Sequence, residues 1–173
     1  MKIEKNRIGI LGGSFDPAHK GHLAISKIAA KKLKLKKIFW AITKKNPFKK
    51  KSNLDLSARI NLCKKITKKI KFIEVKCFEN KVRSNKTINL INFFNRNIKN
   101  EIFFIMGADN LINFHKWHKW KTISKKCTLI VFDRQGYKKK SLNSKTYKTL
   151  NKEKLKFINF NKVNISSSQL RKI

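Results

Sequence analysis

The sequence has few of the residues that characterise secreted, disulfide-stapled or membrane-spanning proteins. Its 173 residues include only three Cys, two Pro and six Gly. The three cysteines are widely spaced and form no CxxC pair, so neither a disulfide framework nor a zinc site is indicated. The apolar run at residues 8–11 is too short for a signal-peptide core, and no stretch approaches the length of a membrane span. We therefore expect a soluble, cytoplasmic protein with no membrane partner.

Acidic residues are also scarce, with 9 Asp and Glu against 44 Lys and Arg, which gives a formal net charge of +35. Only six of the basic residues are Arg, whereas a nucleic-acid reader more often concentrates Arg on one element. We expect a lysine coat on every solvent face, weak salt-sensitive adhesion to polyanions and no specific nucleic-acid partner. A basic nucleic-acid-binding module stays open as an alternative.

The order of apolar segments predicts an α/β fold in a single domain over residues 1–173. A hydrophobic fraction of 40% and thirteen Phe favour a folded globule over a disordered chain. Short apolar, partly β-branched runs predict strands at residues 8–11, 37–42, 71–75, 101–106 and 127–132, and a short sixth at 156–160. Helical spacing predicts helices at residues 23–33, 56–66 and 88–98, with a last one from Ser167. Such alternation is typical of an open, mostly parallel sheet with helices on both faces.

Lysine-rich stretches at residues 48–53 and 136–141 are predicted to be exposed loops.

The first predicted strand runs into GGSFDPAHKGH, residues 12–22. Gly12 and Gly13 let a ligand approach the backbone closely, Pro17 stiffens the turn, and a helix is predicted to begin near His22. Backbone N–H groups and the positive end of that helix would stabilise a phosphate there, and His19 and His22 can donate hydrogen bonds to the same anion. Neither GxGxxG nor a P-loop is present. A metal-binding pair of histidines and a purely structural loop stay open.

A second polar segment, MGADNLINFHKWHKW (106–120), follows the fourth predicted strand. With a strand order of 3-2-1-4-5, Gly107, Asp109 and Asn110 would face the first loop across the crevice where open parallel sheets bind ligands. Asp109 could accept hydrogen bonds from a ribose or cap a helix. Trp117 and Trp120 would be either a stacking platform for a base or part of the core.

The C-terminal ISSSQLRK, residues 165–172, is a third candidate for binding phosphate. Hydroxyl groups at a helix start and the several N–H donors of Arg171 both suit a polyphosphate. A simple helix cap is the alternative.

These segments together resemble a known family. GGSFDPAHKGH resembles the GxFDPxHxGH signature of the nucleotidyltransferase superfamily of adenylyltransferases. GADNLINFHKW resembles the GADNLxxFHxWxxW block of bacterial nicotinate-nucleotide adenylyltransferases, and ISSSQLRK resembles their ISSTxIR. Residues 40–49 and 132–137 are similar to the segments that follow the second and fifth strands of that family.

The resemblance implies a Rossmann-like sheet of order 3-2-1-4-5 plus the short sixth strand, and an enzyme of NAD biosynthesis. Its reaction would transfer the adenylyl group of ATP to nicotinate mononucleotide, giving deamido-NAD and pyrophosphate. Mg²⁺ would be the cofactor, held mainly by the ATP phosphates, so no protein metal site is expected. Adenylyltransferases of nicotinamide mononucleotide or phosphopantetheine are the alternatives within the enzyme class, and the oligomeric state is open.

The family's functional residues carry over to matching positions of this chain. The implied catalytic residues are His19, His22 and Arg171. The implied ATP-binding residues are Gly12, Gly13, Ser14, Phe15, Gly107, Asp109, Ser167 and Ser168. The implied nicotinate mononucleotide-binding residues are Thr43, Ser84, Asn85, Thr87, Trp117 and Arg134.

The chain departs from the family at VRSNKTINL, residues 82–90. The family usually has a Tyr-Thr-x-Asp-Thr-Leu segment there, and this chain keeps Thr87 but lacks the Tyr and the Asp. Because that segment helps to bind the nicotinate end, the choice between acid and amide depends on what replaces it. The backbone amides of Ser84 and Asn85 are the groups expected to hold the carboxylate.

Overall fold

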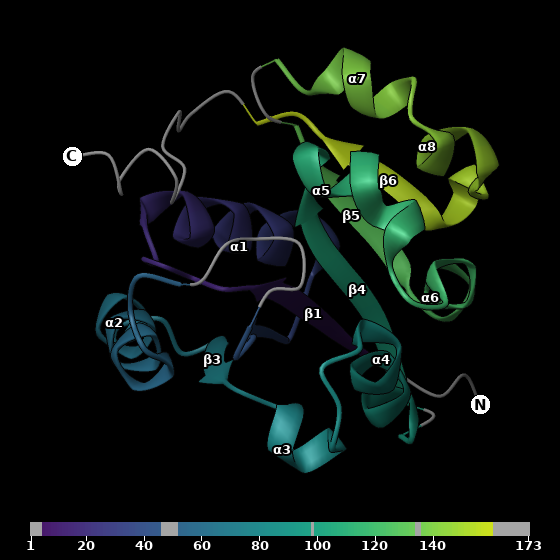
Figure 1. The fold of residues 1–173 in the computed structure, drawn as a ribbon. Coiled ribbons are helices and arrows are strands. Elements are labelled where there is room, and N and C mark those ends of the chain that lie inside the picture. Colours follow the sequence, from purple (N-terminus) through teal and green to yellow (C-terminus); the bar gives the residue numbers. More distant parts are fainter. Residues whose placement is uncertain (1–4, 46–51, 98, 134–135, 161–173) are drawn as a thin grey trace.

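The computed structural model describes residues 5–45, 52–97, 99–133 and 136–160 (Figure 1). Its six strands form one sheet of order β3-β2-β1-β4-β5-β6, and every neighbouring pair is parallel. The strands are β1 (Asn6–Gly13), β2 (Lys37–Ile42), β3 (Ile73–Lys76), β4 (Asn100–Gly107), β5 (Thr128–Phe132) and β6 (Leu155–Ile158). The predicted fold class and strand order are therefore confirmed, and the sixth strand lies at the β5 edge.

The helices connect successive strands. They are α1 (Lys20–Leu33), α2 (Leu56–Thr67), α3 (Glu79–Val82), α4 (Thr87–Asn95), α5 (Ala108–Asn113), α6 (Trp120–Lys126), α7 (Lys138–Leu142) and α8 (Lys145–Thr149), with short 3₁₀ turns η1 (Phe114–Lys116) and η2 (Lys152–Lys154). The predicted helices at 23–33, 56–66 and 88–98 correspond to α1, α2 and α4. The helix predicted from Ser167 lies outside the described residues.

The prediction of an exposed loop at residues 136–141 is wrong in its second half. Residues 138–142 form α7, in which the Ser141 hydroxyl donates a hydrogen bond to the Lys138 carbonyl at 2.8 Å. The three lysines of this stretch are exposed as expected, but Ser141 is buried. A single helical turn with one buried side chain has no apolar period, so the sequence pattern did not indicate it. Most of the other predicted loop, 48–53, lies outside the described residues.

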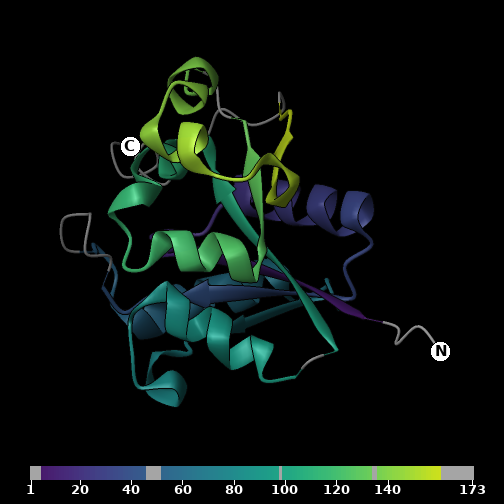
Figure 2. The same ribbon diagram turned by 90° about the vertical axis from the view of Figure 1, so that its right-hand side faces the viewer.

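Alternating side chains of the strands build two cores, one on each face of the sheet. On β4, Ile102, Phe104 and Met106 point to one face, and Phe103 and Ile105 to the other. Helices α4, α5 and α6 cover the first face and α1 and α2 the second. Figure 2 shows α4 and α6 in front of the sheet and α1 behind it. Burial on both faces is what continuous apolar runs in parallel strands require.

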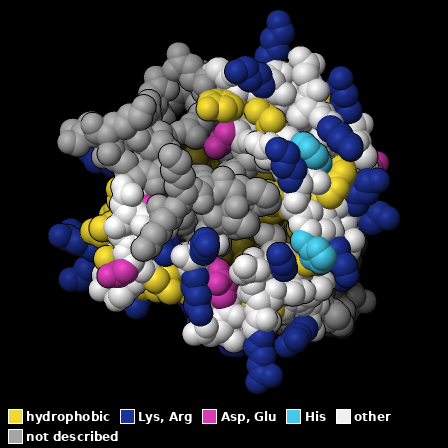
Figure 3. Space-filling view, viewed as in Figure 1, with side chains coloured by type: hydrophobic (Ala, Val, Ile, Leu, Met, Phe, Trp, Pro, Cys, Tyr) yellow, Lys and Arg dark blue, Asp and Glu magenta, His cyan; other side chains and the backbone are white. Residues whose placement is uncertain are grey.

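On the face seen in Figure 3, cationic side chains lie at the top, right, bottom and left of the described part of the molecule, in keeping with the expected lysine coat. Two ion pairs among the described residues, Arg7 with Glu101 and Lys37 with Glu74, lie on the partly exposed surface. No helix in the described part of the chain is long and apolar enough to cross a membrane.

Gly9 lies in β1, which pairs with β2 on one side and with β4 on the other. A Cβ atom added there would lie 2.9 Å from Leu35 Cδ1, 3.0 Å from Ile38 Cγ1 and 3.2 Å from Ile105 Cδ1. All three distances are shorter than an ordinary van der Waals contact, and all three side chains are buried. The glycine therefore allows the core on this face to close over β1.

We expect Gly9→Ala to lower the free energy of unfolding by about 1–3 kcal/mol, because the extra methyl group overpacks this core. Denaturant unfolding followed by circular dichroism measures the change. Asn61→Ala is the matched control, since it adds the same residue at an exposed position of α2 and should change stability by less than about 0.5 kcal/mol. Equal stability of Gly9→Ala and the control would contradict this packing.

Candidate active site

The two motif histidines form the N-terminus of α1. His19 is the N-cap residue, and its Nδ1 accepts a hydrogen bond from the Gly21 backbone N–H at 3.1 Å. His22 Nδ1 accepts one from the His19 backbone N–H at 3.2 Å, which completes a reciprocal capping box. The ring centroids are 3.9 Å apart. Because both Nδ1 atoms accept, the neutral tautomer of each ring carries its proton on Nε2.

Phe15 supports this pair from the core. It has a left-handed φ of 49°, and its ring is buried between Trp40, with centroids 4.9 Å apart, and His22, with centroids 4.7 Å apart. The side chain of this predicted ATP-binding residue is 2% exposed. The Phe15 ring therefore helps to orient the His22 ring, and it is buried away from the cavity.

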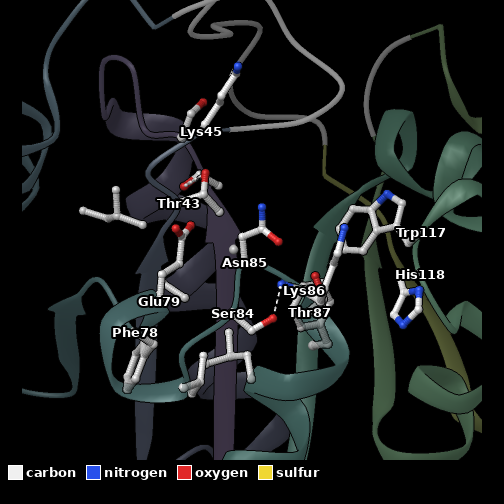
Figure 4. A pocket seen from close by; sticks show the side chains of 18 of the residues that line it. Thr43, Lys45, Phe78, Glu79, Ser84, Asn85, Lys86, Thr87, Trp117 and His118 are labelled. Atoms are coloured by element: carbon white, nitrogen blue, oxygen red, sulfur yellow. Dashed lines mark hydrogen bonds between the residues drawn. The ribbon is translucent and has the colours of Figure 1, made fainter.

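A cavity of about 490 Å³ opens beside this turn, at the carboxyl ends of the central strands (Figure 4). That volume suits a small-molecule ligand. The cavity brings together three predicted ATP-binding residues and all five described mononucleotide-binding residues. These are Gly12, Gly13 and Ser14, and Thr43, Ser84, Asn85, Thr87 and Trp117. They come from the ends of β1 and β2, the segment before α4 with the first residue of that helix, and the segment after η1.

Other predicted site residues lie outside this cavity lining. Phe15 lies in the adjoining turn and His19 and His22 at the N-terminus of α1, whereas Gly107 and Asp109 lie at the start of α5. Their neighbour Asn110 does line the cavity. The predicted residues Arg134, Ser167, Ser168 and Arg171 lie outside the described residues.

The N-cap of α5 is Gly107, so the alternative that Asp109 caps this helix is wrong. Asp109 lies in the first helical turn instead. A Cβ atom added to Gly107 would collide with Asp109 Oδ1, which shows that the carboxylate lies back over the glycine backbone. Glycine at position 107 thus leaves the room that the Asp109 carboxylate occupies.

Both tryptophans of the second motif are half-buried rather than wholly core. Trp117 lines the cavity, and its ring is edge-on to Phe104, with centroids 5.9 Å apart, and tilted against Phe114 at 5.1 Å. Trp120 packs edge-on against Phe114 at 6.3 Å. The core therefore fixes the Trp117 indole while leaving part of it facing the cavity, and Trp120 has the more structural role.

Several charged residues of the cavity were missed from the sequence. Lys45, Lys86 and Lys116 line it, together with His118 and the carboxylate of Glu79. Each is close in sequence to a predicted residue, which is the signal that could have found it. Glu79 Oε1 accepts a hydrogen bond from the Lys44 backbone N–H at 2.9 Å. The described lining therefore carries more positive than negative charge, which suits anionic ligands.

The altered segment before α4 has its own hydrogen-bond arrangement. Lys86 occupies the N-cap of α4 without a side-chain cap, and no acidic residue lies in the first turn. The Ser84 hydroxyl oxygen accepts hydrogen bonds from the Lys86 backbone N–H at 3.0 Å and from Asn89 Nδ2 at 2.8 Å. The positive end of the helix thus faces the cavity beside Asn85 and Thr87 (Figure 4).

The described residues contain no group of three or more His, Cys, Asp or Glu side chains that could hold a metal ion. Burial raises the pKa of the Cys63 and Cys127 thiols to about 12, so neither supplies a thiolate near neutral pH. The polar groups at this site are backbone amides, hydroxyls, imidazoles, lysines and the Glu79 carboxylate, and they include more cations than anions.

This arrangement is that of a nucleotidyltransferase. The sequence profile of the cytidylyltransferase-like family matches residues 10–173, and the chain belongs to this family. A probable nicotinate-nucleotide adenylyltransferase of Pelagibacter ubique is 69% identical over 173 residues, which cover all of this chain and 96% of that relative. One of a Bradyrhizobium species is 36% identical over 151 residues, covering 86% of this chain and 78% of that relative. The predicted resemblance is therefore confirmed.

Solved structures of related fold agree with the architecture. The nicotinic acid mononucleotide adenylyltransferase of Plasmodium falciparum, complexed with NaAD, superposes with a TM-score of 0.80 at 22% identity, covering 96% of this chain and 83% of that one. A putative nicotinate-nucleotide adenylyltransferase of Vibrio parahaemolyticus gives a TM-score of 0.67 at 18% identity, covering 96% of this chain and 85% of that one. At these identities the likeness establishes the fold.

The capping role of His19 can be separated from any role in binding. We expect His19→Ala to lower the free energy of unfolding by about 1 kcal/mol, because the α1 N-terminus loses its cap. His19→Asn, which restores a good N-cap, should recover most of that loss. Thermal and urea unfolding of the two variants measures the difference, and equal stability of both would contradict the capping geometry.

Proposed function

We propose that this chain is a cytoplasmic nicotinate-nucleotide adenylyltransferase, in which a single domain joins ATP and nicotinate mononucleotide to form deamido-NAD and pyrophosphate. The observation that carries the proposal is the cavity, which connects the glycine turn after β1 with Thr43, the segment before α4 and Trp117. The names of the relatives in Pelagibacter and Bradyrhizobium support the same activity. Membership of this family also favours an enzyme over a basic nucleic-acid-binding module.

The chemistry would be an in-line displacement at the α-phosphorus of ATP. A phosphate oxygen of the mononucleotide forms the new P–O bond, and the bond to pyrophosphate breaks. Such a reaction depends on positioning and on stabilising charge in the transition state, with no protein nucleophile needed. His19 and His22 would donate from Nε2 to the phosphates at the α1 N-terminus, while Gly12 and Gly13 let the triphosphate approach the backbone.

Further grips on the two substrates are proposed from the family motifs. Ser167, Ser168 and Arg171 would hold the leaving pyrophosphate, and Asp109 a ribose. At the other end of the cavity, the Trp117 indole would lie against the pyridine ring, with Thr43 and Arg134 completing the mononucleotide site.

The nicotinate carboxylate would be held at the N-terminus of α4. Here the backbone amides near Ser84, Asn85 and Thr87 meet the positive helix end, and Lys86 adds a full positive charge where the family usually has an acid. An amide in place of the carboxylate would lose the charge-assisted hydrogen bonds.

Mg²⁺ would be held mainly by the ATP phosphates. An ion bound in this way needs few protein ligands. When bound, it would neutralise charge on the pyrophosphate leaving group.

Pyrophosphate release tests the proposed reaction. With ATP and Mg²⁺ present, we expect kcat/KM for nicotinate mononucleotide to exceed that for nicotinamide mononucleotide by about tenfold or more, the effect of one or two charge-assisted hydrogen bonds. Phosphopantetheine should give no turnover. Equal rates with acid and amide would contradict carboxylate recognition at α4, and release with none of the three acceptors would contradict the proposed function.

The role of the second histidine is tested by His22→Ala. We expect turnover to fall by about two orders of magnitude or more, because one preorganised donor to the transition state is lost. The far-ultraviolet circular dichroism spectrum should stay that of the folded protein. Turnover near that of the wild type in the folded variant would contradict the assignment.

A further inference from the structure

Arg59 lies in the first turn of α2 and is 1% exposed. A guanidinium group is rarely buried, since removing its charge from water is costly unless its N–H groups are all well bonded. In this structure the group donates hydrogen bonds to four backbone carbonyls. Nε donates to Leu54 at 3.2 Å, Nη1 to Ser14 at 2.7 Å and Thr43 at 2.8 Å, and Nη2 to Lys44 at 3.0 Å.

These four carbonyls belong to three segments that are far apart in the sequence. Ser14 lies in the turn after β1, Thr43 and Lys44 follow β2, and Leu54 precedes α2. Ser14 and Thr43 both line the cavity, and Nη1 bonds to both of their carbonyls. Nη1 of Arg59 therefore links the turn after β1, proposed to meet the ATP phosphates, to the segment after β2, proposed to meet the mononucleotide.

The buried carboxylate of Asp16 reinforces the same junction. Asp16 is 1% exposed, and its two oxygens accept hydrogen bonds from the backbone N–H groups of Asn53 at 2.7 Å and Leu54 at 3.1 Å. The turn after β1 is thus tied to the segment before α2 by Asp16, and that segment is tied back to the turn through Arg59. Asp16 and Arg59 together link the turn after β1, the segment after β2 and the segment before α2 by hydrogen bonds, and we call this set of bonds the frame.

Only arginine can make this set of bonds. Its planar fork presents five N–H donors in fixed and diverging directions, whereas a lysine ammonium offers three donors from one point. We propose that Arg59 is a positioning residue of the active site, which fixes the separation of the Ser14 and Thr43 segments through their backbone carbonyls. The inference rests on the proposed function for its kinetic consequence, but the positioning itself is a property of the ligand-free protein.

Arg59→Lys tests the inference, with Thr67→Val as the matched control. Thr67 is a buried residue two turns further along α2, and its hydroxyl donates to the Cys63 carbonyl at 2.8 Å, away from the site. The first measurement is amide hydrogen exchange in the ligand-free protein. The Thr43 N–H, which donates to the Gly13 carbonyl at 3.0 Å, should exchange about tenfold faster in Arg59→Lys and at the wild-type rate in the control.

The second measurement is the kinetics of the same variants. Arg59→Lys should raise KM for both ATP and nicotinate mononucleotide by about tenfold, whereas Thr67→Val should lower the thermal midpoint without changing KM. Unchanged Thr43 exchange and unchanged KM in Arg59→Lys would overturn the inference. A wild-type enzyme without turnover would refute the proposed function alone, because the exchange measurement would still decide the role of Arg59.

Should Arg59→Lys not fold, Asp16→Asn tests the frame from its other side. The variant keeps the shape of the side chain, but its amide has one acceptor oxygen where the carboxylate has two, so it loses one of the hydrogen bonds from the Asn53 and Leu54 N–H groups. Faster exchange of the Thr43 N–H would support the frame, and exchange at the wild-type rate would overturn it.

Discussion

Strand β1 pairs in parallel with β2 on one side and with β4 on the other, and the location of the site follows from this double pairing. The chain must leave β1 at the point where the strand order reverses, so no helix can cover the carboxyl ends of β1 and β4 together. The glycine turn, the α1 N-terminus and the start of α5 meet there. Gly9 of the same strand lets the core close over β1, so the position of β1 also depends on tight packing at this residue.

The parts that could be predicted from the sequence are those with a local physical signal. The apolar runs located all six strands, and the signal is strongest for the inner strands β1, β2, β4 and β5, because strands buried on both faces need continuous apolar residues. The run at 37–42 has the observed bounds of β2. The glycine turn and both histidines were found because a phosphate-binding loop needs those residue types within a few positions. Thr43, Ser84, Asn85, Thr87 and Trp117 do come together around the cavity, as the family resemblance implied.

The parts that were missed depend on contacts between distant segments. Arg59 looks in the sequence like a solvated residue of a polar helix, and its burial arises from carbonyls as far as 45 positions away. The same holds for α7 and α8, whose few residues show no period and are stabilised by packing near α5. Phe15 was identified from its motif, but the burial of its ring could not be predicted, because a left-handed backbone turns that ring into the core. Tertiary contacts decide such positions.

The most direct test of the account is a crystal structure of the protein with nicotinate mononucleotide. The account predicts the pyridine ring against Trp117, the carboxylate at the N-terminus of α4 beside Lys86, and the phosphate directed toward the turn that carries His19 and His22. A mononucleotide bound away from this cavity, or bound with its carboxylate facing Glu79 instead of α4, would contradict it.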